Sequence, residues 1–172
     1  IEAYLERGGR LLVLLEPRVP NGLEPLLEAW GIRVTPFVAV SPKTLSGQDV
    51  VVSTFADHGV ARNLQNAAVV FGFPACLEVL PQTAQTDADR PQVTLLASTD
   101  RDGWGESQPD VFPRHFDPQS ELRGPVSVAA VAERGARMSR DVALKPTRIC
   151  VFGETGFVSN GALASRANAN RD

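Results

Sequence analysis

Six polar or aromatic side chains in this sequence could act together on a ligand. Three are carboxylates that come after or near a predicted strand, and the others lie in or beside neighbouring loops. In open α/β folds ligands bind at the carboxyl edge of the sheet, where such side chains would meet. A carboxylate cluster there could perform acid–base chemistry or bind a cation. The candidate binding residues are Ser98, Trp104, Glu106, Glu133, Glu154 and Asn160.

Each of these residues also has a purely structural interpretation. Glu106, Glu133 and Glu154 would then cap helices or pair with arginines, and we favour that interpretation for all three. Trp104 lies between two glycines. Its ring could stack on a ligand or close the edge of the sheet, and the second role is favoured.

The sequence offers no catalytic constellation. It has no G-x-S-x-G motif, and Cys76 and Cys150 lie in apolar runs, which is typical of buried free cysteines. A disulfide between them stays open, because sequence separation does not fix the distance. The histidines, His58 and His115, lack the spacing of a zinc site. We therefore predict no catalytic residue, no metal site and no enzymatic activity.

The segment 149–157 is a strand that enters a glycine-containing turn, as in dinucleotide-binding folds. The third glycine of that fingerprint is replaced by Ser159, which compromises the close approach of helix and strand. We therefore predict an ordinary strand-to-helix turn and no cofactor.

Composition restricts the class of protein. The chain has 172 residues, of which 43% are hydrophobic, enough for one domain over 1–172 with a single core. A net charge of -3 without basic clusters argues against nucleic acid as a partner. No apolar run reaches the roughly 20 residues that span a bilayer. Because Ile1 falls within a predicted helix, we expect the chain to be excised from a longer protein.

The spacing of apolar residues predicts alternating helices and strands. The run 11–15 is apolar on both faces, which favours a central strand of a parallel sheet covered by helices on both sides. The run 126–132 fits a strand that is buried on both faces or packed at an edge. The pattern indicates a doubly wound α/β domain, with an exposed loop over 81–91 and a connector over 135–146. A helix is predicted over 23–30, and strands over 11–15, 32–40, 50–55, 67–73, 76–80, 93–97, 126–132 and 148–152.

An ordered set of segments resembles the auxiliary proteins of ABC-type transport systems of the gliding-motility type, a family related to a domain of intraflagellar-transport proteins. The set extends over nearly the whole chain, and its order is more specific than any single piece. The matching segments are 4–17 (YLERGGRLLVLLEP), 22–32 (GLEPLLEAWGI), 98–99 (ST), 104–106 (WGE), 124–133 (GPVSVAAVAE), 148–160 (RICVFGETGFVSN) and 170–172 (NRD).

The resemblance implies a flavodoxin-like or glutamine-amidotransferase-like three-layer sandwich with a mostly parallel sheet. It also implies an extracytoplasmic, periplasmic domain anchored by flanking membrane helices, with an ABC permease and ATPase as partners and a possible homo-oligomer. The family often has Gly-Asp-Ser-Asp-Phe where this chain has GETGF at 153–157. Glu154 thus lengthens the first acid of that motif, and Gly156 replaces the second.

Three classes of function follow. The leading one is a non-catalytic auxiliary domain that assists transporter assembly or binds cargo or a partner. The alternative is a small-molecule or sugar-binding domain with a pocket at the carboxyl edge of the sheet. A hydrolase or amidotransferase relative ranks last, because it requires a nucleophile beside a base.

Overall fold

The computed structural model describes residues 1–44, 49–64, 67–81, 90–135, 138–139, 142–143 and 146–164. Within them, the helices are α1 (Glu2–Glu6), α2 (Glu24–Ala29) and α3 (Asn160–Ala164), with 3₁₀ turns η1 (Arg62–Leu64) and η2 (Gly156–Val158). The strands are β1 (Arg10–Leu14), β2 (Ile32–Val40), β3 (Asp49–Val52), β4 (Val69–Gly72), β5 (Ala75–Val79), β6 (Gln92–Ser98), β7 (Trp104–Glu106), β8 (Leu122–Arg123), β9 (Ser127–Arg134), β10 (Met138–Ser139), β11 (Val142–Ala143) and β12 (Thr147–Phe152).

Helix α2 shows how local sequence sets an element. Asn21 and Glu24 form a capping box: the Leu23 N–H donates to Asn21 Oδ1 (2.8 Å), and the Asn21 N–H donates to Glu24 Oε1 (2.9 Å). Gly31, with a φ of 83°, ends the helix and turns the chain into β2. The predicted helix and the strand after it are both confirmed.

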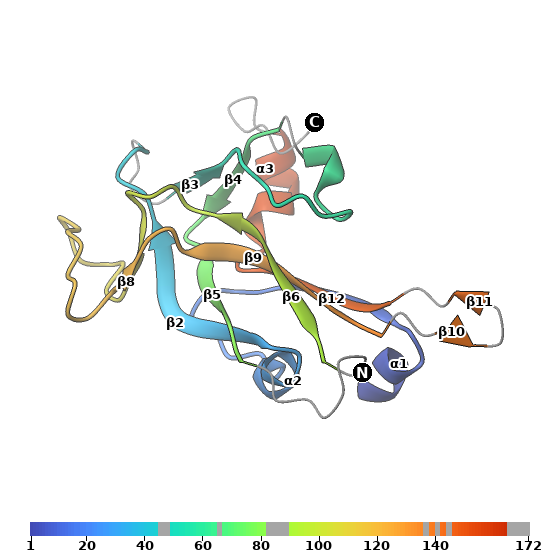
Figure 1. Cartoon of the computed structure of the whole chain (residues 1–172). Coiled ribbons are helices and arrows are strands. Elements are labelled where there is room, and N and C mark those ends of the chain that lie inside the picture. Colours follow the sequence, from blue (N-terminus) through green and yellow to red (C-terminus); the bar gives the residue numbers. More distant parts are fainter. Residues whose placement is uncertain are drawn as a thin grey trace.

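One eight-stranded sheet organises the molecule (Figure 1). Its strand order is β1-β12-β9-β5-β2-β7-β8. Strand β6 stands outside this order and pairs with β9. Only β1 and β12 run parallel among the described strand pairs, and the other pairs are antiparallel. The strands β3 and β4 form a separate two-stranded ribbon.

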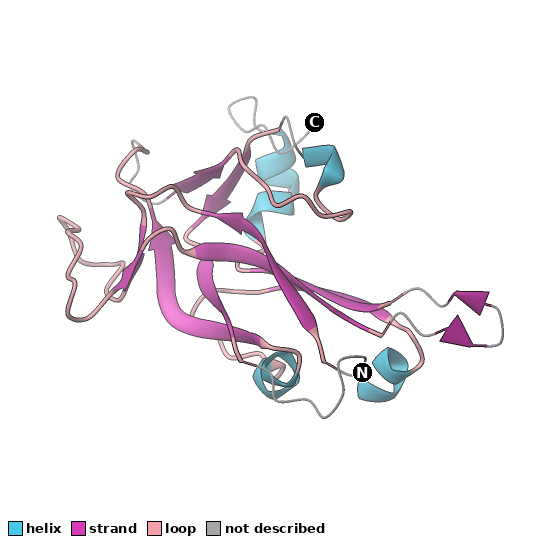
Figure 2. Cartoon of the chain, in the orientation of Figure 1, coloured by secondary structure: helices cyan, strands magenta, loops and turns pink. Residues whose placement is uncertain are grey.

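The predicted fold class is therefore wrong. The chain is not a flavodoxin-like or glutamine-amidotransferase-like three-layer sandwich, because its sheet is mixed and mostly antiparallel. The described helices are short and lie at the periphery, as Figure 2 shows. The predicted central position of the run 11–15 is also wrong, because β1 is an edge strand and Leu12 is 61% exposed. Strand β9 is buried on both faces, but without helices on both of them.

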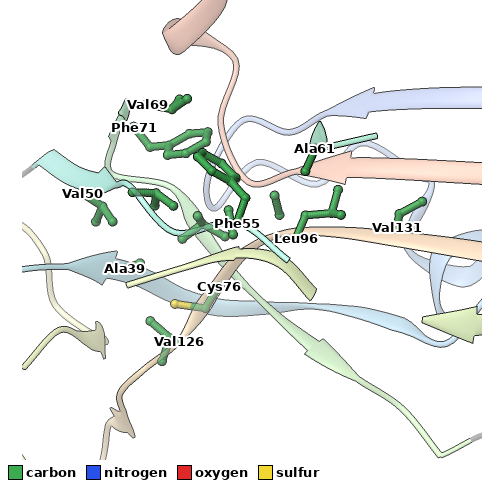
Figure 3. Packing of buried hydrophobic residues seen from close by; sticks show 14 of the residues in the cluster. Ala39, Val50, Phe55, Ala61, Val69, Phe71, Cys76, Leu96, Val126 and Val131 are labelled. Atoms are coloured by element: carbon green, nitrogen blue, oxygen red, sulfur yellow. The ribbon is translucent and has the colours of Figure 1, made fainter. Parts of the chain in front are cut away.

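Two hydrophobic clusters explain the apolar runs. On one face of the sheet, Leu5 of α1 and Leu27 of α2 pack against Ala130 and Ile149. On the other face, the β3–β4 ribbon supplies Phe71, in a cluster shown in Figure 3. Strand β9 lies between the clusters, so its alternating side chains are buried on both sides even though it pairs only with antiparallel neighbours.

Some predicted segments fall partly outside the described residues. Residues 82–89 of the predicted 81–91 loop are among them, as is 170–172. The 135–146 connector contains β10 and β11, a short antiparallel pair. No helix in the described part of the chain is long and apolar enough to cross a membrane.

Candidate functional site

The structure does not bring the six candidate residues together. Glu133 lies at the carboxyl end of β9, opposite Arg148 at the start of β12. Glu154 follows the other end of β12, so these two carboxylates occupy opposite ends of one strand pair. Ser98 pairs with Ser127 at the end of β6. The remaining three residues lie elsewhere: Trp104 and Glu106 in β7, and Asn160 at the start of α3.

Glu133 is held by the guanidinium of Arg148 and the imidazole of His58. Its Oε1 accepts a hydrogen bond from Nε of Arg148 at 2.6 Å, and its Oε2 lies 3.3 Å from Nε2 of His58. Nδ1 of His58 in turn accepts the Val60 N–H at 3.1 Å, so neither imidazole nitrogen is left for a substrate. Burial pushes the pKa of Glu133 upward, but the hydrogen bonds from Arg148 and His58 outweigh burial and hold that pKa below its usual range.

Glu154 is 8% exposed and caps its own turn, because its Oε2 accepts the N–H of Phe157 at 2.9 Å. Burial raises the pKa of this carboxyl group, the hydrogen bonds from backbone N–H groups oppose the rise, and nearby Glu16 adds to it. A Cβ at Gly156 would lie 2.2 Å from Oε1 of Glu154. A side chain at position 156 would therefore require the carboxyl group of Glu154 to move.

Trp104 is 8% exposed, which agrees with the role of closing the sheet edge. Its Nε1–H donates to Oε2 of Glu106 at 3.2 Å, and its ring packs edge-on against Phe116. Glu106 also has an acidic neighbour, Glu121, and both residues line a pocket of about 200 Å³. Glu121 has no signal in the sequence, because only the pairing of β7 with β8 brings it beside Glu106.

A pocket of about 300 Å³ lies beyond the carboxyl ends of the parallel strands β1 and β12. Of the six candidates only Glu154 lines it. Arg18 and Phe73 also line it, and they are the non-glycine residues with positive φ in the described chain, at 61° and 52°. Arg18 forms an exposed ion pair of 3.2 Å with Asp110, which joins the loop after β1 to the loop after β7.

A larger hollow of about 490 Å³ lies on the sheet face that carries Leu77 and Leu95. It is mostly apolar, and the side chains of Val79 and Leu95 are 47% and 40% exposed there. Arg33 and Arg123 also line it. We call this hollow the β5–β6 groove, and its other lining residues are Cys76, Leu77, Glu78, Leu80, Pro81, Leu122, Pro125, Val126 and Ser127.

The remaining chemical groups are internally satisfied. Cys76 and Cys150 are buried and free, and burial raises the pKa of their thiols to about 12 and about 11, so both stay protonated at neutral pH. Among the described residues no cluster of three metal-ligating side chains occurs. In the same residues, no buried side-chain nitrogen or oxygen lacks a hydrogen-bond partner.

Comparisons with known proteins place the fold. No family model matches the sequence, and no curated protein matches it. Among solved structures, the mmIFT52 N-terminal domain is similar, with a TM-score of 0.61 and 18% sequence identity. The match covers 98% of this chain but only 64% of that structure's length. At this identity the likeness shows a shared fold alone, and it agrees with the intraflagellar-transport part of the resemblance.

Proposed function

We propose that the chain is a non-catalytic, extracytoplasmic auxiliary domain of an ABC-type transporter, and that it binds a protein partner in the β5–β6 groove. The ordered resemblance of its segments supports the transporter assignment. The groove supports the mode of action, and it is the observation that carries the proposal, because it is larger than the pockets beside Glu106 and Glu154 and its lining is mostly apolar.

The charged candidates offer less to a partner. Glu133, Glu154 and Glu106 accept hydrogen bonds from Arg148, from backbone N–H groups and from Trp104, respectively. Recruiting any of them to a ligand would break an internal contact that costs about 1 kcal/mol or more to lose. Apolar side chains exposed in a groove carry no such penalty.

Beside the groove, the last residues of β5 pair with β2 but with no other described strand. On the side of β5 that faces β2, the Leu80 N–H donates to the carbonyl oxygen of Gly31 at 2.8 Å. Hydrogen-bonded and non-bonded pairs alternate in an antiparallel ladder, so Leu77 and Val79 direct their backbone groups away from β2. Leu77 meets Ser127 of β9 there, and beyond it no described strand stands opposite Val79.

The partner that fits is an extended segment of another protein, added beside β5. Its alternate side chains would be apolar to cover Val79 and Leu95, and acidic residues at its ends would face Arg33 and Arg123. An extracytoplasmic loop of the permease has the position to supply such a segment. The ATPase would then associate through the permease.

The test is co-purification of the full-length protein from its native membrane in mild detergent, followed by mass spectrometry. We expect permease and ATPase in near-stoichiometric amounts. Leu95→Glu and Val79→Glu place a charge in the apolar groove and should reduce recovery about ten-fold. Val51→Glu is the matched control, because Val51 is a 49% exposed strand residue outside the groove.

Two results would contradict the proposal. Recovery of the protein alone at several detergent strengths excludes a stable transporter complex. Full recovery of partners by both groove variants excludes the groove as the binding surface while leaving the complex itself intact.

A second candidate is small-molecule or sugar binding in the pocket lined by Glu16, Arg18, Phe73 and Glu154. It is favoured by the positive φ of Arg18 and Phe73, because strained backbone gathers at functional sites. Saturation-transfer NMR with neutral mono- and disaccharides tests it. Transfer to a sugar that disappears in Phe73→Gly, which keeps the backbone conformation, supports this candidate, and no transfer removes it.

A further inference from the structure

The loop after β7 begins and ends at a pair of carboxyl groups. The register of β7 with β8 places Trp104 opposite Arg123 and Gly105 opposite Leu122. Continuing the same register places Glu106 opposite Glu121, with residues 107–120 forming the loop between them. Directly opposed residues of an antiparallel pair have Cβ atoms about 5 Å apart, and like charges there repel. Figure 1 shows this loop projecting from the sheet beside β8.

Both carboxyl groups accept hydrogen bonds from neighbouring N–H groups. Glu106 accepts the Trp104 indole N–H at 3.2 Å and the Gln108 N–H at 2.8 Å. Glu121 accepts the Ser107 N–H at 3.2 Å and the Asp117 N–H at 2.8 Å. These bonds bind the start and the end of the loop to the same two side chains.

One arginine of the loop acts on the pair. Arg114 directs its guanidinium to the carbonyl of Pro109 and stacks on Phe112, with 3.9 Å to the ring centroid. Its charge favours the ionised form of Glu106, and so leaves the proton to Glu121. Three other polar groups of the loop line the pocket: His115, Asp117 and Ser120.

Asp117 adds a negative charge, because the Gln119 N–H and the Ser120 hydroxyl hold its pKa below its usual range. On the side of the sheet, β2 places Val38, which has no charge, opposite Glu106. Arg123 of β8 directs its guanidinium over the ring of Phe116.

We infer that Glu106 and Glu121 share one proton, and that this proton closes the neck of the 107–120 loop. Glu106 is 5% exposed and Glu121 is partly exposed, so two ionised carboxylates placed together there would repel each other. A single proton converts this repulsion into a carboxyl–carboxylate hydrogen bond, which is among the stronger kinds.

The direction of each pKa agrees with this arrangement. Burial, and then the contact with Glu106, raise the pKa of Glu121. For Glu106 burial acts upward, but the hydrogen bonds from Glu121, Gln108 and Trp104 outweigh it and lower its pKa. The shared proton therefore resides on Glu121, and Glu106 accepts from it.

Loss of the proton would loosen the loop. The repulsion would separate Glu106 from Glu121. The hydrogen bonds that Glu121 accepts from the N–H groups of Ser107 and Asp117 would then break. The same loop carries Asp110, the partner of Arg18 at the 300 Å³ pocket. The carboxyl pair thus makes the wall of that pocket sensitive to pH, a property that does not depend on the proposed transporter function.

Trp104 supplies the test, because its indole N–H donates to Glu106. The chain has two tryptophans, so a ¹⁵N correlation spectrum contains two side-chain indole signals. Trp30, whose ring stacks under Arg134, is the internal reference. In buffer with a chelator, we expect the Trp104 signal to titrate with a midpoint above the usual range for glutamic acid, and Trp30 not to follow. A Trp104 signal that stays fixed, or that titrates within the usual range, overturns the inference.

Glu121→Gln is the matched variant. Its amide donates permanently to Glu106, so we expect the upper titration step of Trp104 to disappear and the signal to stay near its acid position. An unchanged step in Glu121→Gln overturns the inference. So does recovery of the acid spectrum at neutral pH on adding Ca²⁺ or Mg²⁺, because a cation would then bridge the pair. The wild-type titration decides the matter even if Glu121→Gln does not fold.

Discussion

Two acidic centres of this molecule satisfy a carboxylate in opposite ways. At the carboxyl end of β9, Glu133 lies between Arg148 and His58. At the neck of the 107–120 loop, Glu106 lies against another carboxyl group, that of Glu121. Both centres lie beside strand ends and are partly or wholly buried, so residue type and position do not distinguish them. The sign of the neighbouring charge does.

The difference gives the two centres opposite pH dependences. The pKa of Glu133 is lowered in the fold, so its contribution to stability is present above the usual glutamate pKa and is lost as pH falls through the lowered value. The pKa of Glu121 is raised, so its contribution is present below the usual pKa and is lost as pH rises through the raised value. One centre stabilises the fold at neutral pH and the other at acid pH.

Arg148→Met is the strongest way to break the comparison, because it removes the guanidinium whose Nε and Nη2 both contact Oε1 of Glu133. We expect the free energy of unfolding at neutral pH to fall by about 2 kcal/mol. The side chains of Arg148 and Glu133 are 26% and 27% exposed, so the loss is smaller than for a fully buried pair. Urea unfolding monitored by circular dichroism measures it.

The double variant Arg148→Met with Glu133→Gln is the control. Removing the unpaired charge should recover about half of the lost stability, since the single variant suffers mainly from a carboxylate without its cation. A single variant as stable as the wild type would show that solvent, not Arg148, satisfies Glu133, and the contrast between the two centres would fail.

The sequence located the strands but not their directions. The run over 126–132 was expected to be a strand buried on both faces or packed at an edge, and β9 is buried on both faces. A run of apolar residues indicates that a strand is buried on both sides, but it does not indicate which elements cover those sides. Here α1 and α2 cover one face and the β3–β4 ribbon covers the other. The direction of a strand depends on how the connections cross the sheet. The periodicity of apolar residues does not indicate the path of those connections.

For the candidate site, the sequence predicted the bonding partners of two carboxylates but not the positions of the residues relative to one another. Pairing with arginine and capping were the favoured interpretations of the carboxylates, and they hold for Glu133 and Glu154. Their convergence at one edge rested on parallel strands, whose carboxyl ends meet. With β9 antiparallel to β12, Glu133 and Glu154 lie at opposite ends instead. The Glu106–Glu121 pair depends on the register of β7 and β8, which short strands of three and two residues do not reveal in sequence.

Glu154 is an intermediate case, since backbone N–H groups satisfy it. We expect Glu154→Ala to lower the free energy of unfolding by about 1 kcal/mol, because the Phe157 N–H loses its acceptor. Recovery of transporter partners should not change, since Glu154 lies outside the β5–β6 groove. Loss of partner binding at an unchanged melting temperature would contradict a structural role and favour the pocket beside Glu16.

Glu121→Gln is expected to change stability least, and it tests whether the two acidic centres respond differently to pH. At neutral pH it replaces a carboxyl group that must keep a proton by an amide that donates without one, so the variant should be more stable than the wild type by about 0.5 kcal/mol. The difference should vanish at acid pH, where the wild-type pair is protonated. Glu6→Gln, at an exposed carboxylate of α1, should show no such trend. Urea midpoints of the three proteins across the pH range measure it. If the stability difference between Glu121→Gln and wild type were the same at every pH, no proton would be shared, and the two acidic centres would differ in surroundings without differing in pH response.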